Sequence, residues 1–353
     1  MTAQIISKAG SVAENKKARG LAEVENIPRA TFEEGFDINE HINVNKGVAE
    51  FVASDDFASA FYTRQRYEVD AGRDEEPLLY MPIYDEVVDA SLPRTLNINT
   101  LGTGGVVFKE IKEGGEVVFA TIGEGSKSVT LLHHAVGLSY TEDLFLYNEL
   151  WRLPNIERVF GIAHNALLNH IHFNPILAYT YAAANKTDGT ALTDFNATDE
   201  LPLKYLHAIE AAITAAVADN RRGPYSLVVS TSNLFTVERA LNIVAQQGFS
   251  KQSSAISRIS NVIAYDGWTG TRGKKSTTYS GVTAGTGYLT DLSHKAIDFQ
   301  SYAKHTLRRQ VQPGDMKRFV VEEVIWDTRR GVYAGPANAV EEITWPVAAS
   351  GAS

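Results

Sequence analysis

Residues 118–144 read VFATIGEGSKSVTLLHHAVGLSYTEDL, with apolar runs on both sides of the polar stretch GEGSKS. This stretch could be a phosphate-binding loop or the turn of a β-hairpin. A P-loop needs a lysine directly after its last glycine and a helix that begins there. Here Ser126 separates Gly125 from Lys127, and the Ser-Val-Thr-Leu-Leu that follows favours a strand. The sequence therefore favours a hairpin turn, with no helix N-terminus aimed at a phosphate.

The hairpin extends beyond this turn, and we expect a long β-ribbon over 106–136. VVFKEI, EVVFATI and SVTLLHHAV are typical of strands, and EGGE and GEGSKS are typical of turns. The sequence gives little sign of a helix that could cover the ribbon. An uncovered ribbon is marginally stable, and its free edges pair with other chains, so we expect it to contact neighbouring subunits. The residues expected to make this contact are Val117, Phe119, Ile122, Lys127, Val129 and Leu131.

Composition limits the classes of function. The chain has 353 residues, of which 44% are hydrophobic, enough for one large elaborated domain or two ordinary ones. Its net charge of −9 argues against tight binding of nucleic acid, which depends on lysine and arginine. It has no cysteine, which excludes disulfides, thiolate metal sites and a cysteine nucleophile. It has neither a secretory signal nor an apolar run of the ~18 residues needed to cross a membrane.

The first half of the chain is expected to contain an arm and several helices. Residues 1–46 are polar and irregular and predict an extended arm, and 47–68 show a rough helical face that ends at AGRDEEP. Ser139 and Glu142 have capping-box spacing, which predicts a short helix to about Trp151. Pro154 suits the first turn of a longer helix that Pro175 should kink or shorten.

The second half predicts an α+β body. LPLKYLHAIEAAITAAVADN is typical of an amphipathic helix, and YSLVVST, RISNVIAYDGW and GYLTD are typical of strands. Ser232 or Asn233 is expected to cap the helix FTVERALNIVAQQG. The Gly- and Thr-rich TGTRGKKSTTYSGVTAGTG predicts a loop, and the closing RFVVEEVIWDTRRGVYAGPANAVEEITW predicts two antiparallel strands around TRRG.

Residues that could carry chemistry do not form a recognisable site. There is no G-x-S-x-G elbow, and no Ser–His–Asp set or H-E-x-x-H metal motif stands out. The histidines of HNALLNHIH are expected on a helix surface, and the acidic pairs on solvated strand faces. The basic pairs are expected to be solvated charges or ion pairs between subunits. The acidic and basic pairs are Glu322–Glu323, Glu341–Glu342, Arg221–Arg222, Lys274–Lys275, Arg308–Arg309 and Arg329–Arg330. We therefore expect no enzymatic activity, no metal and no cofactor.

The order of these elements resembles the major capsid protein of tailed bacteriophages, with the Hong Kong 97-type fold that encapsulins and herpesvirus capsid floors also use. Two stretches carry the resemblance: the long hairpin GGEVVFATIGEGSKSVTLLHHAVGLSYTEDL and the helix LPNIERVFGIAHNALLNHI that follows it. The match covers about residues 80–345 and rests on element order rather than on a signature motif.

The resemblance implies an α+β chain with a fixed domain order. It implies an N-terminal arm over 1–79, and then the first part of a peripheral (P) domain over 80–200. This part would hold an extended E-loop at 106–136 and a spine helix at 154–184. An axial (A) domain would occupy 201–310, and strands that return to the P domain would occupy 311–353.

The resemblance also implies function and partners. The subunit would assemble with itself as pentamers and hexamers into an icosahedral shell that encloses double-stranded DNA. The negative chain suits weak, non-specific contact with that DNA. It would reside in the virion capsid, after assembly in the host cytoplasm without a membrane. The arm before about residue 47, too poor in apolar residues to fold alone, would wrap neighbouring subunits.

Two features depart from the family's founder. The founder carries a cleaved scaffolding segment, whereas the arm here is short and irregular, so we expect a separate scaffolding protein or none, along with a portal and decoration proteins. The founder also cross-links an E-loop lysine to an asparagine. Lys127 lies near the ribbon tip, but PGDMKRFVVEE lacks an asparagine, and Asn338 is a distant substitute. We therefore expect a shell held together without covalent cross-links.

Two alternatives stay open on the sequence. An encapsulin-like nanocompartment would share the fold and enclose an enzyme cargo, and a docking groove for a cargo peptide would favour it. An α+β enzyme is the alternative from another class, and it would form a small oligomer rather than a shell.

Overall fold

A computed structural model describes residues 55–99, 126–141, 153–192, 200–246, 257–272, 274–313, 320–335 and 337–346. Its chain divides into two compact units. The described residues of unit 1 are 55–75, 138–141, 153–162, 311–313 and 320–324, and the other described residues form unit 2. Each unit is described by itself below.

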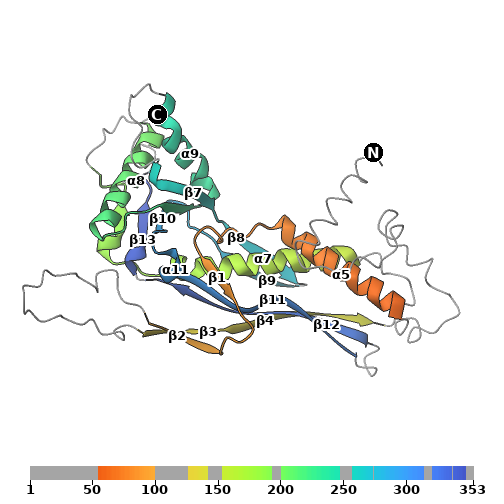
Figure 1. Ribbon diagram of the computed structural model, residues 1–353. Coiled ribbons are helices and arrows are strands. Elements are labelled where there is room, and N and C mark those ends of the chain that lie inside the picture. The colour runs from red at the N-terminus through yellow and green to blue at the C-terminus, as the bar shows by residue number, and fades with distance from the viewer. Residues whose placement is uncertain are drawn as a thin grey trace, which may run out of the picture. The chain divides into compact units, whose positions relative to one another are not determined.

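The described helices and strands are interspersed along the chain (Figure 1). The helices are α5 (Asp55–Glu75), α7 (Leu153–Leu177), α8 (Leu201–Ala218), α9 (Thr231–Gln246) and the short α11 (Lys295–Asp298), with 3-10 turns η3 (Ala183–Asn185) and η5 (Ala337–Ala339). The strands are β1 (Asp85–Val88), β2 (Thr95–Asn99), β3 (Ser126–Thr130), β4 (Leu132–Thr141), β5 (Lys186–Asp188), β6 (Tyr225–Val229), β7 (Ile259–Ala264), β8 (Gly267–Arg272), β9 (Lys275–Ser280), β10 (Thr286–Asp291), β11 (Phe299–Pro313), β12 (Val320–Ala334) and β13 (Val340–Thr344).

A five-stranded mixed sheet with the order β5-β13-β10-β6-β7 lies in unit 2. Strand β10 is antiparallel to both β13 and β6, whereas β5 and β7 run parallel to their neighbours. Every residue of β6 is buried. Its sequence, YSLVV, is a short, nearly continuous apolar run, which is typical of a strand covered on both faces.

Two hydrophobic cores lie on opposite faces of this sheet. Because side chains alternate along a strand, Leu227 and Leu289 join one core, while Val228 and Tyr288 join the other. The first core is completed by α8 and α9, and the second by residues 168–177 of α7. Figure 1 shows α8 (green) and α9 on one side of the sheet. The sheet is therefore the rigid centre of unit 2.

A second sheet has the strand order β1-β11-β12-β4. Strand β1 runs parallel to β11, with Asp85 opposite Gln300 and Val88 opposite Ala303. Strands β11 and β12 each have 15 residues, which is long for a globular protein. Two further pairs of strands are antiparallel ribbons, β2 with β3 and β8 with β9.

In unit 1, helices α5 and α7 approach each other closely through two glycines. A Cβ atom added to Gly72 would overlap the carbonyl oxygen of Arg158, and one added to Gly161 would overlap the carbonyl oxygen of Val69. The backbones therefore touch where a side chain would keep them apart. An ion pair between Arg158 and Glu75 lies beside this crossing.

Several expected elements are confirmed. The amphipathic helix over LPLKYLHAIEAAITAAVADN is α8, and the strands expected at YSLVVST, RISNVIAYDGW and GYLTD are β6, β7 and β10. The helix expected from Pro154 is α7, which begins at Leu153. Pro175 lies inside its last turn, and the helix ends at Leu177 instead of continuing to 184, because a proline removes a backbone donor.

Other expectations were wrong. Ser139 lies in strand β4 and caps no helix, and Ser232 and Asn233 lie inside α9, which begins at Thr231. The helix expected to end at AGRDEEP runs through AGRDE to Glu75. TRRG is no turn: it lies within β12, where neighbouring strands on both sides outweigh the weak strand propensity of glycine. The Gly- and Thr-rich segment expected to be a loop contains β8 and β9.

Some expectations fall outside the described residues. These are the N-terminal arm over 1–46, the short helix that ends near Trp151, and most of the 106–136 ribbon, of which only 126–136 is described.

We predict that Gly161→Ala lowers the free energy of unfolding, by about 2–4 kcal/mol, because its methyl group must push the two helix backbones apart. At an unhindered helical position the same change would be stabilising, by about 1 kcal/mol, so the sign of the effect tests the crossing. Urea unfolding measures this change in free energy, and hydrogen exchange of the α5 amides reports on the crossing itself. Gly72→Ala, on the other helix, should have the same effect, and unchanged or higher stability in both variants would contradict the crossing.

Candidate functional site

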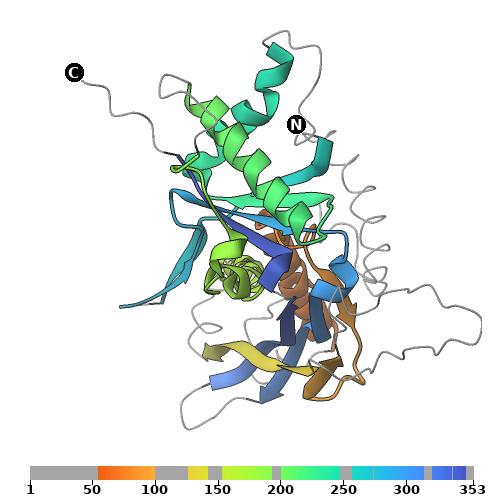
Figure 2. The same cartoon turned by 90° about the vertical axis from the view of Figure 1, so that its left-hand side faces the viewer.

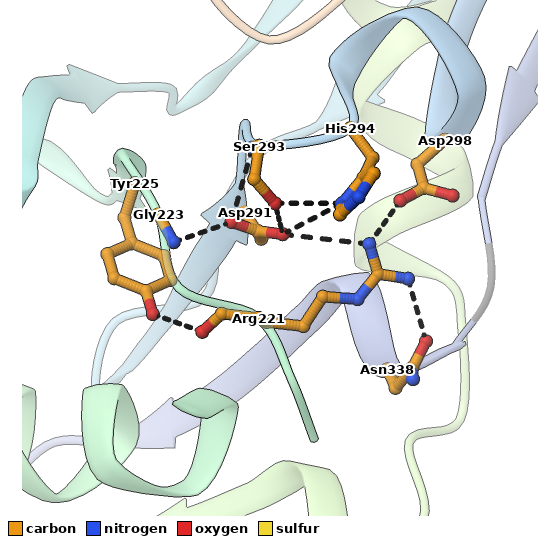
Figure 3. Close-up of polar contacts among 8 residues, drawn as sticks. All are labelled: Arg221, Gly223, Tyr225, Asp291, Ser293, His294, Asp298 and Asn338. Carbon is orange, nitrogen blue, oxygen red and sulfur yellow. Dashed lines mark hydrogen bonds and ion pairs between the residues drawn. The ribbon is translucent and has the colours of Figure 1, made fainter. Parts of the chain in front are cut away.

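The most buried charged residue among those described is Arg221, between α8 and β6, whose side chain has no exposed surface. Its guanidinium forms ion pairs with Asp298 and, at 3.6 Å, with Asp291, both about 2% exposed. It also donates a hydrogen bond of 3.1 Å from Nη2 to Oδ1 of Asn338. We call these residues, together with Gly223, Tyr225, Ser293 and His294, the Arg221 cluster (Figure 3).

The cluster connects segments that are far apart in the sequence. Asp291 ends β10, Asp298 ends α11, and Asn338 lies in η5. Asp291 also accepts a hydrogen bond of 3.0 Å from the backbone N–H of Gly223, and the Tyr225 hydroxyl donates one of 2.5 Å to the Arg221 carbonyl. A buried arginine with two buried carboxylates is costly to desolvate, and the added hydrogen bonds offset part of that cost.

Ser293, His294 and Asp291 bring together the residue types of a catalytic triad, as Figure 3 shows. In a working triad the serine and the carboxylate bind opposite nitrogens of the imidazole. Here Nδ1 of His294 faces both Ser293 Oγ, at 2.9 Å, and Asp291 Oδ2, at 4.0 Å. Ser293 also donates its proton to Asp291. This geometry cannot relay a proton from serine through histidine, so the group is a structural turn.

A second polar cluster surrounds Asp327 on the central strand β12, and its carboxylate is 1% exposed. Arg308 on β11 donates two hydrogen bonds of 3.0 Å to this carboxylate. His305 on β11 and His133 on β4 place Nε2 at 3.3 and 3.0 Å from Asp327 Oδ2. Burial alone would raise the pKa of Asp327, but hydrogen bonds from Arg308 and His133 outweigh it and hold that pKa below its ordinary value.

Two histidines and a carboxylate resemble the donor set of a metal site, but Arg308 argues against one here. Its guanidinium occupies both carboxylate oxygens and would repel a cation. Over the described ranges, no group of three or more histidine, aspartate or glutamate side chains is arranged to hold a metal ion.

His172 of α7 is fully buried, which corrects the expectation of a surface histidine. Its Nδ1 lies 2.6 Å from the Leu168 carbonyl, so Nδ1 carries the proton, and Nε2 lies 2.8 Å from the Ser301 hydroxyl. Tyr80 stacks on the ring at 3.5 Å between centroids. Burial lowers the pKa of His172 to about 3, which makes it a neutral core residue rather than an acid or base.

Several charged residues that were expected to be solvated are buried. Arg221 is one, and Arg330 of β12 is 2% exposed and pairs with Glu86 of β1 at 2.6 Å. Glu322 and Glu341 are 6% and 3% exposed. Sequence pattern missed Arg221, Arg330 and Glu341 because each has its partner on a distant segment.

Glu341 of β13 accepts a hydrogen bond of 2.9 Å from the Thr187 hydroxyl of β5. Burial raises the pKa of its carboxyl to about 7, and the Thr187 hydrogen bond opposes part of that rise. The folded chain therefore favours the neutral acid below pH 7.

The residues expected to make intersubunit contacts divide into two groups. Val117, Phe119 and Ile122 lie outside the described residues. Lys127, on β3, is exposed, with its Nζ 5.6 Å from the centroid of the Tyr333 ring. Val129 and Leu131 are 6% and 7% exposed.

Val129 and Leu131 pack inside the subunit itself. An added Cβ on Gly331 of β12 would lie 2.7 Å from Val129 Cγ1, which shows how closely this strand approaches them. Strand β3 pairs with β2 from Thr95↔Thr130 to Asn99↔Ser126, so the second half of the expected turn GEGSKS is strand and not turn. The described part of the ribbon is therefore a base fixed to the subunit, and its intersubunit role stays a prediction.

Comparison with known proteins gives no sequence relative: no family model matches, and no curated protein matches. Similar solved structures exist. A virus-like particle subunit from Pyrococcus furiosus aligns with a TM-score of 0.51 and 8% identity, over 80% of this chain and 99% of that chain. The capsid of a native GTA particle aligns with a TM-score of 0.48 and 14% identity, over 76% of this chain and 90% of that chain. A phage-related protein from Bordetella bronchiseptica aligns with a TM-score of 0.46 and 13% identity, over 79% of this chain and 96% of that chain.

The fold assignment rests on the first of these structures, since the other two TM-scores are below 0.5. The chain has a mixed helix-and-sheet fold similar to that of the virus-like particle subunit. Among the described helices, none is long and apolar enough to cross a membrane.

We predict that Arg221→Met lowers the free energy of unfolding by about 3–5 kcal/mol, because it leaves Asp291 and Asp298 buried without a cation. Urea unfolding at pH 7 measures the loss. The matched control is Arg222→Met at the exposed neighbouring position, which should change stability by no more than about 0.5 kcal/mol. Equal effects of the two substitutions would contradict the role of the cluster.

We also predict that Glu341→Gln raises the free energy of unfolding at pH 8 but not at pH 4.5. The unfolded chain loses this proton near the ordinary value of 4.5 and the folded chain near 7, so wild-type stability falls as pH rises between them. Glutamine cannot ionise, so the variant should have a free energy of unfolding roughly 2–4 kcal/mol higher than that of wild type at pH 8. Unfolding free energies across pH 4–8 test this, with Glu342→Gln as control. A parallel pH profile for Glu341→Gln and wild type would overturn it.

Proposed function

We propose that this chain is the major shell subunit of a tailed-bacteriophage capsid, with a Hong Kong 97-type fold. It assembles as pentamers and hexamers into an icosahedral shell that encloses double-stranded DNA. The observation that carries the proposal is the capsid-type fold. The structural alignment covers 99% of the Pyrococcus furiosus virus-like particle subunit.

Within this proposal the larger structural elements have the following roles. Helix α7 is the spine helix, and the four-stranded sheet is the P domain. The five-stranded sheet with α8 and α9 is the A domain. The β2–β3 pair is the base of the E-loop, and its distal part is the 26-residue segment 100–125. The arm before about residue 47 contacts neighbouring subunits.

The chemistry of the described residues supports a structural role. The Arg221 and Asp327 clusters hold segments together, and the contacts of neither match a catalytic arrangement. Asn338, the distant substitute for a cross-link acceptor, already accepts a hydrogen bond from Arg221, which supports a shell without covalent cross-links. The net charge of −9 supports weak, non-specific contact with packaged DNA.

The proposal includes partners besides other copies of the chain. These are a separate scaffolding protein, a portal and decoration proteins, with assembly in the host cytoplasm and residence in the virion.

A second candidate is an encapsulin-like compartment around a protein cargo. The observation that favours it is that the Pyrococcus furiosus structure is described as a virus-like particle and not as a phage head. The contents of purified particles distinguish the two candidates, since a phage head holds DNA and a compartment holds protein.

Mass photometry of the purified protein, with electron microscopy, tests the proposal. It predicts capsomers of five or six times 38.6 kDa, or closed particles of uniform size. A species no larger than a tetramer under all assembly conditions would contradict it.

The E-loop assignment has its own test, in which Asn-Gly replaces residues 100–125. Asn99 and Ser126 are paired, and Asn-Gly suits a two-residue hairpin turn, so β2 and β3 stay joined. We predict a folded subunit that forms no closed shell, because the distal ribbon no longer reaches a neighbour. Circular dichroism and thermal melting check folding, and electron microscopy checks assembly. Shells of normal size from this variant would show that the segment is dispensable.

A further inference from the structure

The β8–β9 hairpin belongs to neither of the two larger sheets. Among the described strands, β8 and β9 pair only with each other, from Gly267↔Ser280 to Arg272↔Lys275. In Figure 2 the hairpin extends to the left, away from the rest of unit 2. An isolated two-stranded ribbon is marginally stable in water, so an exposed one needs an anchor, a partner, or both.

The anchor is at the root of the hairpin. The Tyr279 ring stacks on His170 of α7 at 4.4 Å between centroids, and on Trp268 at 5.6 Å. Gly267 has φ of +79°, and an added Cβ there would overlap the Tyr279 carbonyl oxygen, so the sharp entry to the hairpin requires glycine. The root therefore fixes the direction in which the outer half projects.

The outer half is polar and positively charged. One face carries only hydroxyl side chains, all exposed: Thr269, Thr271, Ser276, Thr278 and Ser280. Lys274 and Lys275 at the tip are also exposed. Residues 267–281 contain three basic and no acidic residues. Since the whole chain carries −9, the remainder of it carries −12.

Neither edge of the hairpin pairs with another described strand. With no third described strand beside them, the outward N–H and C=O groups of β8 and β9 can receive another extended segment. Nucleic acid cannot use such an edge. Single strands also bind through stacking on aromatic side chains, and the two aromatic residues of the hairpin are stacked together at its root. These features favour a polypeptide partner with acidic residues.

We propose that the β8–β9 hairpin is an assembly arm that binds a second copy of this chain. An extended, carboxylate-bearing segment of the neighbouring copy lies along the hairpin edge, and Lys274 and Lys275 form ion pairs with it. The charge complementarity between the basic hairpin and the remainder of the chain selects a copy of the chain over a neutral partner. This inference rests on the proposed function, because only an assembled shell presents a second copy to every hairpin.

The test treats assembled particles with a water-soluble carbodiimide, which joins a lysine amine to a carboxylate in direct contact. Peptide mapping then compares the dimer and monomer bands from a denaturing gel. We expect Lys274 or Lys275 joined to an Asp or Glu peptide in the dimer band and not in the monomer band. Particles in which both lysines remain unlinked, or are linked only within one copy or to DNA, would overturn the proposal. If no particles form under any assembly condition, the result contradicts the proposed function and not the hairpin contact alone.

A pair of variants tests the energetic contribution of the tip. Lys274→Glu with Lys275→Glu should reduce the yield of closed particles at least tenfold, because both charges then repel the acidic partner. The control, Arg222→Glu with Arg239→Glu, makes the same change in net charge at two exposed positions outside the hairpin. Circular dichroism checks that both proteins fold. An equal yield from the hairpin variant and from wild type would contradict the arm.

Discussion

The structure of unit 2 depends on a sheet that is buried on both faces. Strand β6 has no exposed residue, and its alternating side chains enter two separate cores, one with α8 and α9 and the other with α7. A sheet covered on both sides cannot change register, since a shift by one residue would exchange the two sets of side chains. The loops and ribbons that leave this sheet therefore start from fixed positions. In the proposed shell, this rigidity lets weak contacts recur identically in every copy.

Buried charges then fix connections at both larger sheets. Arg221 joins the end of β10, the end of α11 and η5, and Arg330 of β12 reaches Glu86 of β1. Asp327 joins three neighbouring strands in the same way, through Arg308 and His305 on one side and His133 on the other. Apolar packing alone is tolerant of small shifts, whereas a buried ion pair has one geometry that satisfies it. The clusters thus specify how these strands and helices are connected, although removing their charges from water costs free energy.

Much of the fold could be predicted from local sequence, because periodicity reports which face of an element is buried. The helix at LPLKYLHAIEAAITAAVADN and the strand at YSLVVST have such patterns, and both are present as α8 and β6. The charged residues could not be placed this way. Arg221 and Glu341 look like solvated residues because their partners, Asp298 and Thr187, are 77 and 154 residues away.

The β8–β9 hairpin was missed for a different reason. Its strands are rich in glycine and threonine and carry no apolar alternation, since neither face of the outer half is buried in the subunit. Hydrophobic periodicity indicates which residues are buried within one chain, but it does not indicate which exposed surfaces contact another chain. The 106–136 ribbon was predicted because its strands are apolar, and most of it stays a prediction. Only its base, with Val129 and Leu131 buried beside Gly331, lies among the described residues.

The central claim is that copies of this chain form a closed shell, and electron cryomicroscopy of purified particles tests it most directly. The account predicts a reconstruction with icosahedral symmetry. In it, the five-stranded sheet with α8 and α9 surrounds the capsomer axes, and the chain segment between β2 and β3 lies on a neighbouring subunit. A discrete small oligomer without shell symmetry, or a shell whose subunits touch through neither ribbon nor hairpin, would contradict it.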